Sequence, residues 1–228
     1  SDEAPSSAEL EARGEDAGML RAGDADPNTI ISVTGWQTTT QQFHTIRARQ
    51  FADCSGDSIL APLTGAPYRI GRESREEFGE SIQPENDDRL VMGMSVLIQA
   101  REMDEPVTFT PPEWAHHYES VDDLPNRHLD PYKTNFWWIE LGGPDDTIHN
   151  TEAIRAELVS RAYGVWDLIK NRSDLEGVDR LELEYLGLFP GKRESRRYEG
   201  DYMVTQNDVE SQGRFPDTVA YGGWTMDD

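Results

Sequence analysis

One segment of the chain has a clear helical period, and it lies between segments of strand composition. Ile154, Leu158, Ala162, Val165 and Ile169 recur at intervals of four, four, three and four residues, which places their side chains on one face of an α-helix. An acidic residue stands in the first turn of this segment and a basic residue in the last, as the helix dipole favours. The pattern predicts an amphipathic helix packed in a mixed α/β fold.

The predicted strands are runs rich in β-branched and aromatic residues. They occupy residues 29–36, 41–53, 89–101, 107–111, 134–143 and 181–189. Residues 68–88 are dense in mixed charge and predict an exposed helix or loop, whereas residues 113–131 predict a polar, turn-rich connection. Residues 1–28 carry eight acids and two arginines without an aromatic or β-branched side chain. This composition predicts a flexible acidic arm or, alternatively, a short helix around residues 8–21.

Charge and composition exclude several classes of protein. The formal net charge is −23, so the chain repels nucleic acid and we expect no such partner. The longest apolar run, residues 90–98, is shorter than the roughly 20 residues that cross a bilayer, so we expect no membrane span. The amino end has no secretory signal, which leaves the cytoplasm as the expected location. Cys54 alone supplies neither a disulfide nor a four-cysteine iron–sulfur or zinc site. His116 and His117 are adjacent and face opposite sides of an extended chain, so we expect no metal there.

A short basic segment departs from the acidic character of the chain. Its four cations lie within six residues: Lys192, Arg193, Arg196 and Arg197. One interpretation is that they neutralise nearby carboxylates such as Glu182, Glu184 and Glu194 in a solvated charge run. The other is that planar, permanently charged guanidinium groups bind a carboxylate, a phosphate or the electron-rich edge of a reduced cofactor.

A second candidate site follows the predicted strand of residues 41–53. Ser55, Gly56 and Asp57 place small residues and a carboxylate at the carboxyl end of that strand, where open α/β sheets bind ligands. No Gly-x-Gly sequence occurs in the chain, so the glycine fingerprint that holds a dinucleotide pyrophosphate is absent.

The same segment begins a series of recognisable blocks. It reads Phe-Ala-Asp-Cys-Ser-Gly-Asp at residues 51–57. The later blocks, in chain order, are residues 68–75, 136–143, 163–171, 190–197, 200–202 and 215–224. In sequence and order these blocks resemble the FAD-dependent oxidoreductase family that includes the heterodisulfide reductase A-like flavoproteins. The resemblance covers about residues 29–228, with Ser55 where the family more often has Thr.

The resemblance implies both a fold and a reaction. It implies an α/β and α+β protein, in which a partial FAD/NAD(P)-binding, Rossmann-like domain joins a β-rich, mixed-sheet substrate domain. Residues 29–67 are then the late part of the FAD-binding domain, residues 68–189 the substrate domain and residues 190–228 a return segment to the FAD-binding domain. The implied function is FAD-dependent, flavin-mediated hydride transfer on an unidentified small or sugar-like substrate. The redox partner is left open.

The resemblance also assigns roles to the two candidate sites. The cofactor-binding candidates are Ser55, Gly56 and Asp57, and the catalytic candidates are Arg193, Arg196 and Arg197. The arginines would stabilise the anionic reduced flavin or grip an acidic substrate group. Family members carry a glycine-fingerprint βαβ unit ahead of the matched region and continue beyond its end. We therefore expect an internal or truncated fragment with poor FAD affinity, inactive alone.

A protein of another class is the alternative. It is a non-catalytic, acidic carbohydrate-binding or interaction module with an aromatic stacking platform of Trp114, Tyr118, Trp137 and Trp138. Tryptophans aligned on the exposed face of a complete domain would favour it. Packing of residues 29–57 against residues 200–228 would favour the flavoenzyme. A glycoside hydrolase would need two carboxylates about 5–10 Å apart in a cleft, which sequence does not reveal.

Overall fold

The computed structural model describes residues 26, 28–124, 129 and 136–222, and only the main chain of residues 136–138. The chain divides into two compact units, Ser1–Pro67 and Tyr68–Asp228. The acidic arm expected over residues 1–28 lies almost wholly outside the described residues. No helix in the described part of the chain has the length and apolar character needed to cross a membrane.

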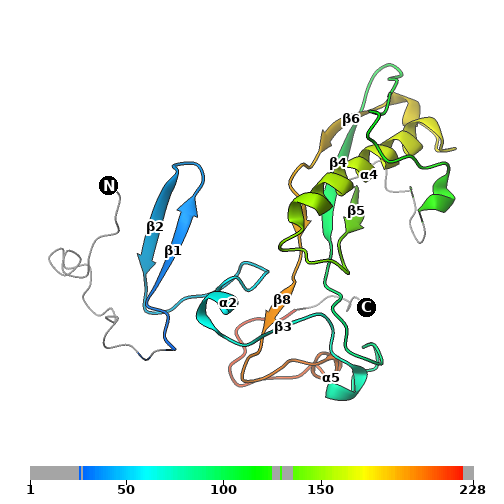
Figure 1. Cartoon of the computed structure of the whole chain (residues 1–228). Coiled ribbons are helices and arrows are strands. Elements are labelled where there is room, and N and C mark those ends of the chain that lie inside the picture. The colour runs from blue at the N-terminus through cyan, green and yellow to red at the C-terminus, as the bar shows by residue number, and fades with distance from the viewer. Residues whose placement is uncertain (1–25, 27, 125–128, 130–135, 223–228) are drawn as a thin grey trace. The chain divides into compact units, whose positions relative to one another are not determined.

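The first unit contains an antiparallel hairpin and a short helix (Figure 1). Strands β1 (Ser32–Gln37) and β2 (Gln42–Arg47) pair so that Trp36 lies opposite Phe43, with ring centroids 4.8 Å apart. Helix α2 spans Leu60–Thr64. The strand predicted over residues 41–53 ends at Arg47, earlier than expected. The carboxylate of Asp53 accepts the N–H groups of Ser55 and Leu60, and such local side-chain bonds compete with strand pairing.

The second unit is built around a four-stranded antiparallel sheet. Its strands β4 (Met94–Glu102), β5 (Phe136–Leu141) and β6 (Leu181–Leu186) are ordered β5-β4-β6, and β7 (Gly191–Lys192) also pairs with β4. Helix α4 (Thr151–Asn171) packs across one face (Figure 1). The predicted helix is confirmed, because α4 begins and ends within a few residues of the expected apolar stripe.

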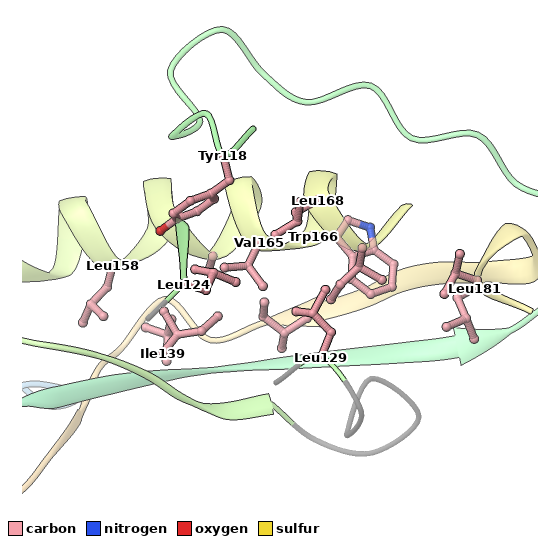
Figure 2. Close-up of a cluster of buried hydrophobic side chains, with 14 of the residues drawn as sticks. Tyr118, Leu124, Leu129, Ile139, Leu158, Val165, Trp166, Leu168 and Leu181 are labelled. Atoms are coloured by element: carbon pink, nitrogen blue, oxygen red, sulfur yellow. The ribbon is translucent and has the colours of Figure 1, made fainter. Parts of the chain in front are cut away.

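The core lies between α4 and the sheet. All five residues of the predicted helical stripe are buried, and Figure 2 shows Leu158, Val165 and Trp166 directed toward the strands. The helix is also covered from a second side, by the segment that precedes Tyr118. A Cβ on Gly164 would lie 2.1 Å from the carbonyl oxygen of His116, so this segment runs directly against the helix. The start of the connection expected over residues 113–131 therefore packs against helix α4.

A smaller two-stranded sheet in the second unit joins residues far apart in sequence. Strand β3 (Tyr68–Ile70) pairs antiparallel with β8 (Arg196–Tyr198). The short helices α3 (Arg75–Phe78) and α5 (Gln206–Glu210), and 3-10 turns at Val121–Asp123 and Val178–Arg180, complete the described elements. The mixed α/β class is confirmed. Every described strand pairing is antiparallel, so the Rossmann-like part of the expectation stays a prediction.

Two sequence-based expectations for the second unit are wrong. Residues 107–111 form no strand, because prolines on both sides of the run remove the N–H groups that a sheet needs. Phe109 instead packs beside the rings of Tyr163 and Trp166. Residues 68–88 are not simply an exposed charged segment: they supply β3 and α3, and they bury two carboxylates, Glu73 and Glu80.

Candidate functional site

The basic segment crosses both sheets of the second unit. Lys192 ends β7 on the four-stranded sheet, and Arg196 begins β8 on the smaller one. The three candidate arginines line three adjoining cavities, which share Glu194 and Ser195 as wall residues. Arg193, Arg196 and Arg197 therefore lie near one another, but each side chain has its own surroundings.

Arg197 lies in an ion-pair network with a buried carboxylate. Its Nη2 is 2.9 Å from Oε1 of Glu73 and also donates to the carbonyl oxygen of Gly71. Arg69, opposite Arg197 on β3, approaches the same Glu73 oxygen at 3.6 Å. Burial alone would raise the pKa of Glu73, but the hydrogen bond from Arg197 and the charges of both arginines leave that pKa below its ordinary value. Glu73 is thus held as a carboxylate.

Arg197 and Glu73 line a cavity of about 400 Å³. One wall of this cavity is apolar, with Ile82, Leu90, Val91 and Met92, and the polar wall includes Glu194 and Ser195. Within the described part of the chain, Nε and Nη1 of Arg197 donate no hydrogen bond. An anchored guanidinium with unused donors beside an apolar wall is the arrangement of a small-molecule site.

Arg193 and Arg196 have different partners. Nη1 of Arg193 lies 3.6 Å from Oε2 of Glu140 on β5. Arg196 is buried, with its guanidinium 5.7 Å from the ring centroid of Tyr68. Glu140 and Glu73 are thus carboxylates beside Arg193 and Arg197. Of the three carboxylates named on sequence proximity, Glu182 and Glu184 pair with Arg101 at 3.0 and 3.4 Å, and Glu194 lines the cavities of Arg193 and Arg197.

The second candidate site lies in the first unit, in the turn before α2. Asp53 Oδ1 accepts hydrogen bonds from the N–H and the hydroxyl of Ser55, and Ser55 Oγ accepts the N–H of Ile59. The Ser55 side chain therefore organises the turn. Gly56 has a φ of +79°, and a Cβ there would meet no atom within 4 Å. Its N–H has no acceptor among the described residues.

This turn fits a cofactor that approaches the main chain. Gly56 combines an unused N–H with open space, which is what a dinucleotide phosphate or sugar needs for contact with backbone. The carboxylate of Asp57 follows immediately. The two candidate sites lie in different units, so each has a geometry of its own.

The aromatic platform of the alternative class is not supported. Tyr118 is buried as part of the hydrophobic core. Trp114 is exposed but packs edge-on against Tyr163, at 5.0 Å between centroids. The side chains of Trp137 and Trp138 lie outside the described residues. In the described part of the chain, no three His, Cys, Asp or Glu side chains are grouped to hold a metal ion.

Comparison with known proteins then defines the class as an oxidoreductase. The model of the family described as FAD dependent oxidoreductase matches residues 15–228. The chain therefore belongs to that family, and FAD is the cofactor that its family uses, as the sequence blocks implied. The comparisons with curated proteins and with solved structures each gave no significant match.

Sequence reasoning named Arg197 but missed the residue that holds it. Glu73 stands among several acids between residues 73 and 80, and no local pattern separates it from its exposed neighbours. Its burial follows from the pairing of β3 with β8, which joins residues more than a hundred positions apart. Thr147, a buried threonine in the turn before α4, was also missed.

Proposed function

We propose that the second unit supplies the substrate side of a flavin-dependent oxidoreductase, and that the Arg197–Glu73 cavity receives a small or sugar-like substrate. The observation that carries this proposal is the anchored Arg197 guanidinium in a cavity of about 400 Å³ with an apolar wall. The sequence blocks support a place among the heterodisulfide reductase A-like members of the family. FAD, when bound, accepts the hydride of the oxidation.

Arg197 acts through its charge and its free donors. Glu73 and the Gly71 carbonyl fix one end of the guanidinium, which leaves Nε and Nη1 to bind an oxygen of the substrate or to stabilise negative charge nearby. Glu73 is a positioning residue, because it acts by holding Arg197. Arg193 and Arg196 remain candidates for the same role. Each follows or precedes in sequence a residue that lines the Arg197–Glu73 cavity: Arg193 precedes Glu194, and Arg196 follows Ser195.

In the first unit, Ser55, Gly56 and Asp57 are proposed to contact FAD. Gly56 would donate its N–H, Ser55 would hold the shape of the turn, and Asp57 would accept from a hydroxyl of the cofactor. Residues 29–67 then form the late part of the FAD-binding domain, residues 68–189 the substrate domain and residues 190–228 the return segment.

A pair of matched glycine variants tests the cofactor contact. Gly56 and Gly65 lie in the same unit with φ values of +79° and +78°, and a Cβ meets nothing within 4 Å at either position. Gly56→Ala and Gly65→Ala therefore carry the same backbone strain. We expect Gly56→Ala to weaken FAD binding by about tenfold, because its methyl group blocks the approach to the main chain, and Gly65→Ala to leave binding unchanged. Equilibrium dialysis against FAD measures both. Equal affinities in the two variants would contradict the contact.

The role of Arg197 is tested on the flavin itself. If Arg197 stabilises charge on the reduced cofactor, Arg197→Gln lowers the midpoint potential of bound FAD. Arg214→Gln is the control, since Arg214 is exposed and forms no ion pair among the described residues. An unchanged midpoint potential in Arg197→Gln would mean that Arg197 does not stabilise the reduced flavin and that its proposed role is limited to binding the substrate.

A further inference from the structure

A second cavity in the same unit adjoins the Arg197–Glu73 cavity and shares Val91 and Ser195 with it. It measures about 210 Å³ and lies between β3, β8 and the turn that precedes α4. Two arginines and a buried threonine line it, Arg89, Arg196 and Thr147. The rest of the lining combines the apolar residues Ile70, Val91, Pro144 and Ile148 with polar and charged ones.

The hydroxyl of Thr147 is the first indication of a ligand. Thr147 is only 2% exposed, and its Oγ1 has no hydrogen-bond partner among the described residues. A buried hydroxyl without a partner is costly, because it has lost its water without gaining a protein bond. The same residue's carbonyl oxygen is already used, since it accepts the hydroxyl of Thr151. The side-chain oxygen is thus the polar atom of Thr147 that lacks a partner among the described residues, and it belongs to a residue of the cavity wall.

The charge of the cavity selects the kind of ligand. Arg89 is exposed and has no ion-pair or hydrogen-bond partner among the described residues, in a chain with a net charge of −23. Arg196 is 8% exposed and brings a second guanidinium to the same wall, held against the Tyr68 ring. Both groups are permanently charged, and their planar geometry suits a planar oxoanion.

Two carboxylates also line the cavity, both at exposed positions, and they balance its formal charge. Asp146 is committed to its own turn: its Oδ1 accepts the N–H groups of Ile148 and His149, each at 3.0 Å, and its Oδ2 lies 2.7 Å from His149 Nδ1. Asp145 is exposed at the rim. The buried part of the wall is therefore cationic and hydroxylic.

We propose that this cavity is a binding site for a small organic carboxylate. Arg89 and Arg196 would bind the carboxylate oxygens, Thr147 would donate its hydroxyl to one of them, and the apolar wall would receive the hydrocarbon part of the ligand. The apolar wall argues for an organic acid over inorganic phosphate, which offers no apolar surface to bury.

Calorimetric titration with three probes tests the ligand class. The probes are 3-methylbutanoate, its uncharged amide 3-methylbutanamide and inorganic phosphate, each titrated into the full chain without FAD, so the result does not depend on the proposed function. We expect one saturable site for the carboxylate, with binding of the amide weaker by about tenfold or more because the charge-assisted bonds are lost. Equal binding of acid and amide, tighter binding of phosphate, or no binding of the acid would overturn the proposal.

Variants then assign the binding to these residues. Arg89→Gln, at an exposed position, should weaken binding of 3-methylbutanoate by about tenfold, whereas Arg214→Gln, also exposed and unpaired among the described residues, should not. Thr147→Val keeps the shape and removes the hydroxyl, so it should weaken binding by about threefold or more while the melting temperature of the free protein stays equal or rises. A lower melting temperature in Thr147→Val, or unchanged binding in Arg89→Gln, would overturn the assignment.

Discussion

The two layers of the second unit bury different kinds of side chain. Between α4 and the four-stranded sheet the buried residues are almost all apolar. Around β3 and β8 they are polar or charged: Glu73, Glu80, Ser195, Arg196 and Gln206. The first layer gains stability from apolar burial, which is non-directional. The second layer depends on specific hydrogen-bond and ion-pair partners. These partners hold the side chains in defined positions, but the layer loses stability when one of them is removed. The candidate cavities lie along the second layer.

The polar layer is also connected across large distances in sequence. Glu80 accepts the backbone N–H of Gln206 at 2.6 Å, and Gln206 Oε1 in turn accepts the N–H of Ile82 at 3.1 Å. These bonds join the start of the unit to its end, alongside the Arg197–Glu73 pair. Loss of one partner leaves a buried polar group unsatisfied, which costs more than the net value of the bond. The loss of unfolding free energy caused by a substitution in this layer should therefore depend on salt and pH, whereas the loss caused by a substitution in the apolar layer should not.

The largest effect is expected from Trp166→Ala. Trp166 is fully buried in the apolar layer, and truncation of a buried tryptophan leaves a cavity that costs about 3–5 kcal/mol of unfolding free energy. Urea unfolding measures this loss, and the loss should be the same at low and high salt. Tyr221→Ala is the matched control, because Tyr221 is 99% exposed and its truncation should cost little. If the loss of unfolding free energy in Trp166→Ala depended on salt, the two layers would not differ in their response to salt as we expect.

A smaller effect is expected from Glu73→Gln. The change removes the carboxylate shared by Arg197 and Arg69, whose side chains are 38% and 30% exposed, so solvent screens part of the interaction. We expect a loss of about 1–3 kcal/mol, below the cost of breaking a fully buried pair. The loss should decrease as salt is added.

Glu76→Gln is the control for this prediction. Glu76 lies three residues further along, is exposed, and has no ion pair among the described residues. Urea unfolding at two salt concentrations should show a salt-dependent loss in Glu73→Gln and almost none in Glu76→Gln. Similar losses in both variants would show that the buried network contributes nothing specific to this layer.

The apolar layer was predictable from sequence, and the polar layer was not. The stripe from Ile154 to Ile169 predicted α4 because a helix buries residues at a local period. The strands near β4, β5 and β6 were visible for similar reasons, from composition over short windows. Burial of Glu73 follows instead from a pairing between β3 and β8, and no local window contains both strands.

The candidate site divides in the same way. The excess of positive charge at residues 192–197 pointed to Arg197, and the glycine-containing turn pointed to Gly56, because both are local features. The surroundings of each of the three arginines, which line three adjoining cavities, depend on tertiary structure. Their carboxylate partners depend on it too: sequence proximity suggested Glu182, Glu184 and Glu194, and the first two pair with Arg101. Composition can therefore locate a charged segment, but it does not show which of its charges share a ligand.

The smallest effect is expected where the two layers meet, at the turn before α4. The hydrogen bonds from His149, through its main chain first and then its ring, lower the pKa of Asp146 from 3.8 to about 2. A carboxyl whose pKa is lowered on folding adds stability that is complete above its unfolded pKa and lost as the pH falls through the folded one. Because Asp146 is exposed, Asp146→Asn should cost under about 1 kcal/mol at neutral pH.

The pH dependence of that cost separates the turn from both layers. The difference in unfolding free energy between the wild type and Asp146→Asn should be constant from pH 7 to about pH 5 and should shrink between pH 4 and pH 2. Urea unfolding at several pH values measures it. Asp145→Asn is the control, since Asp145 is exposed and its side chain has no partner among the described residues. A difference that persists unchanged at the lowest pH would mean that the turn is held by its shape, and that the Asp146 charge contributes nothing to the junction of the layers.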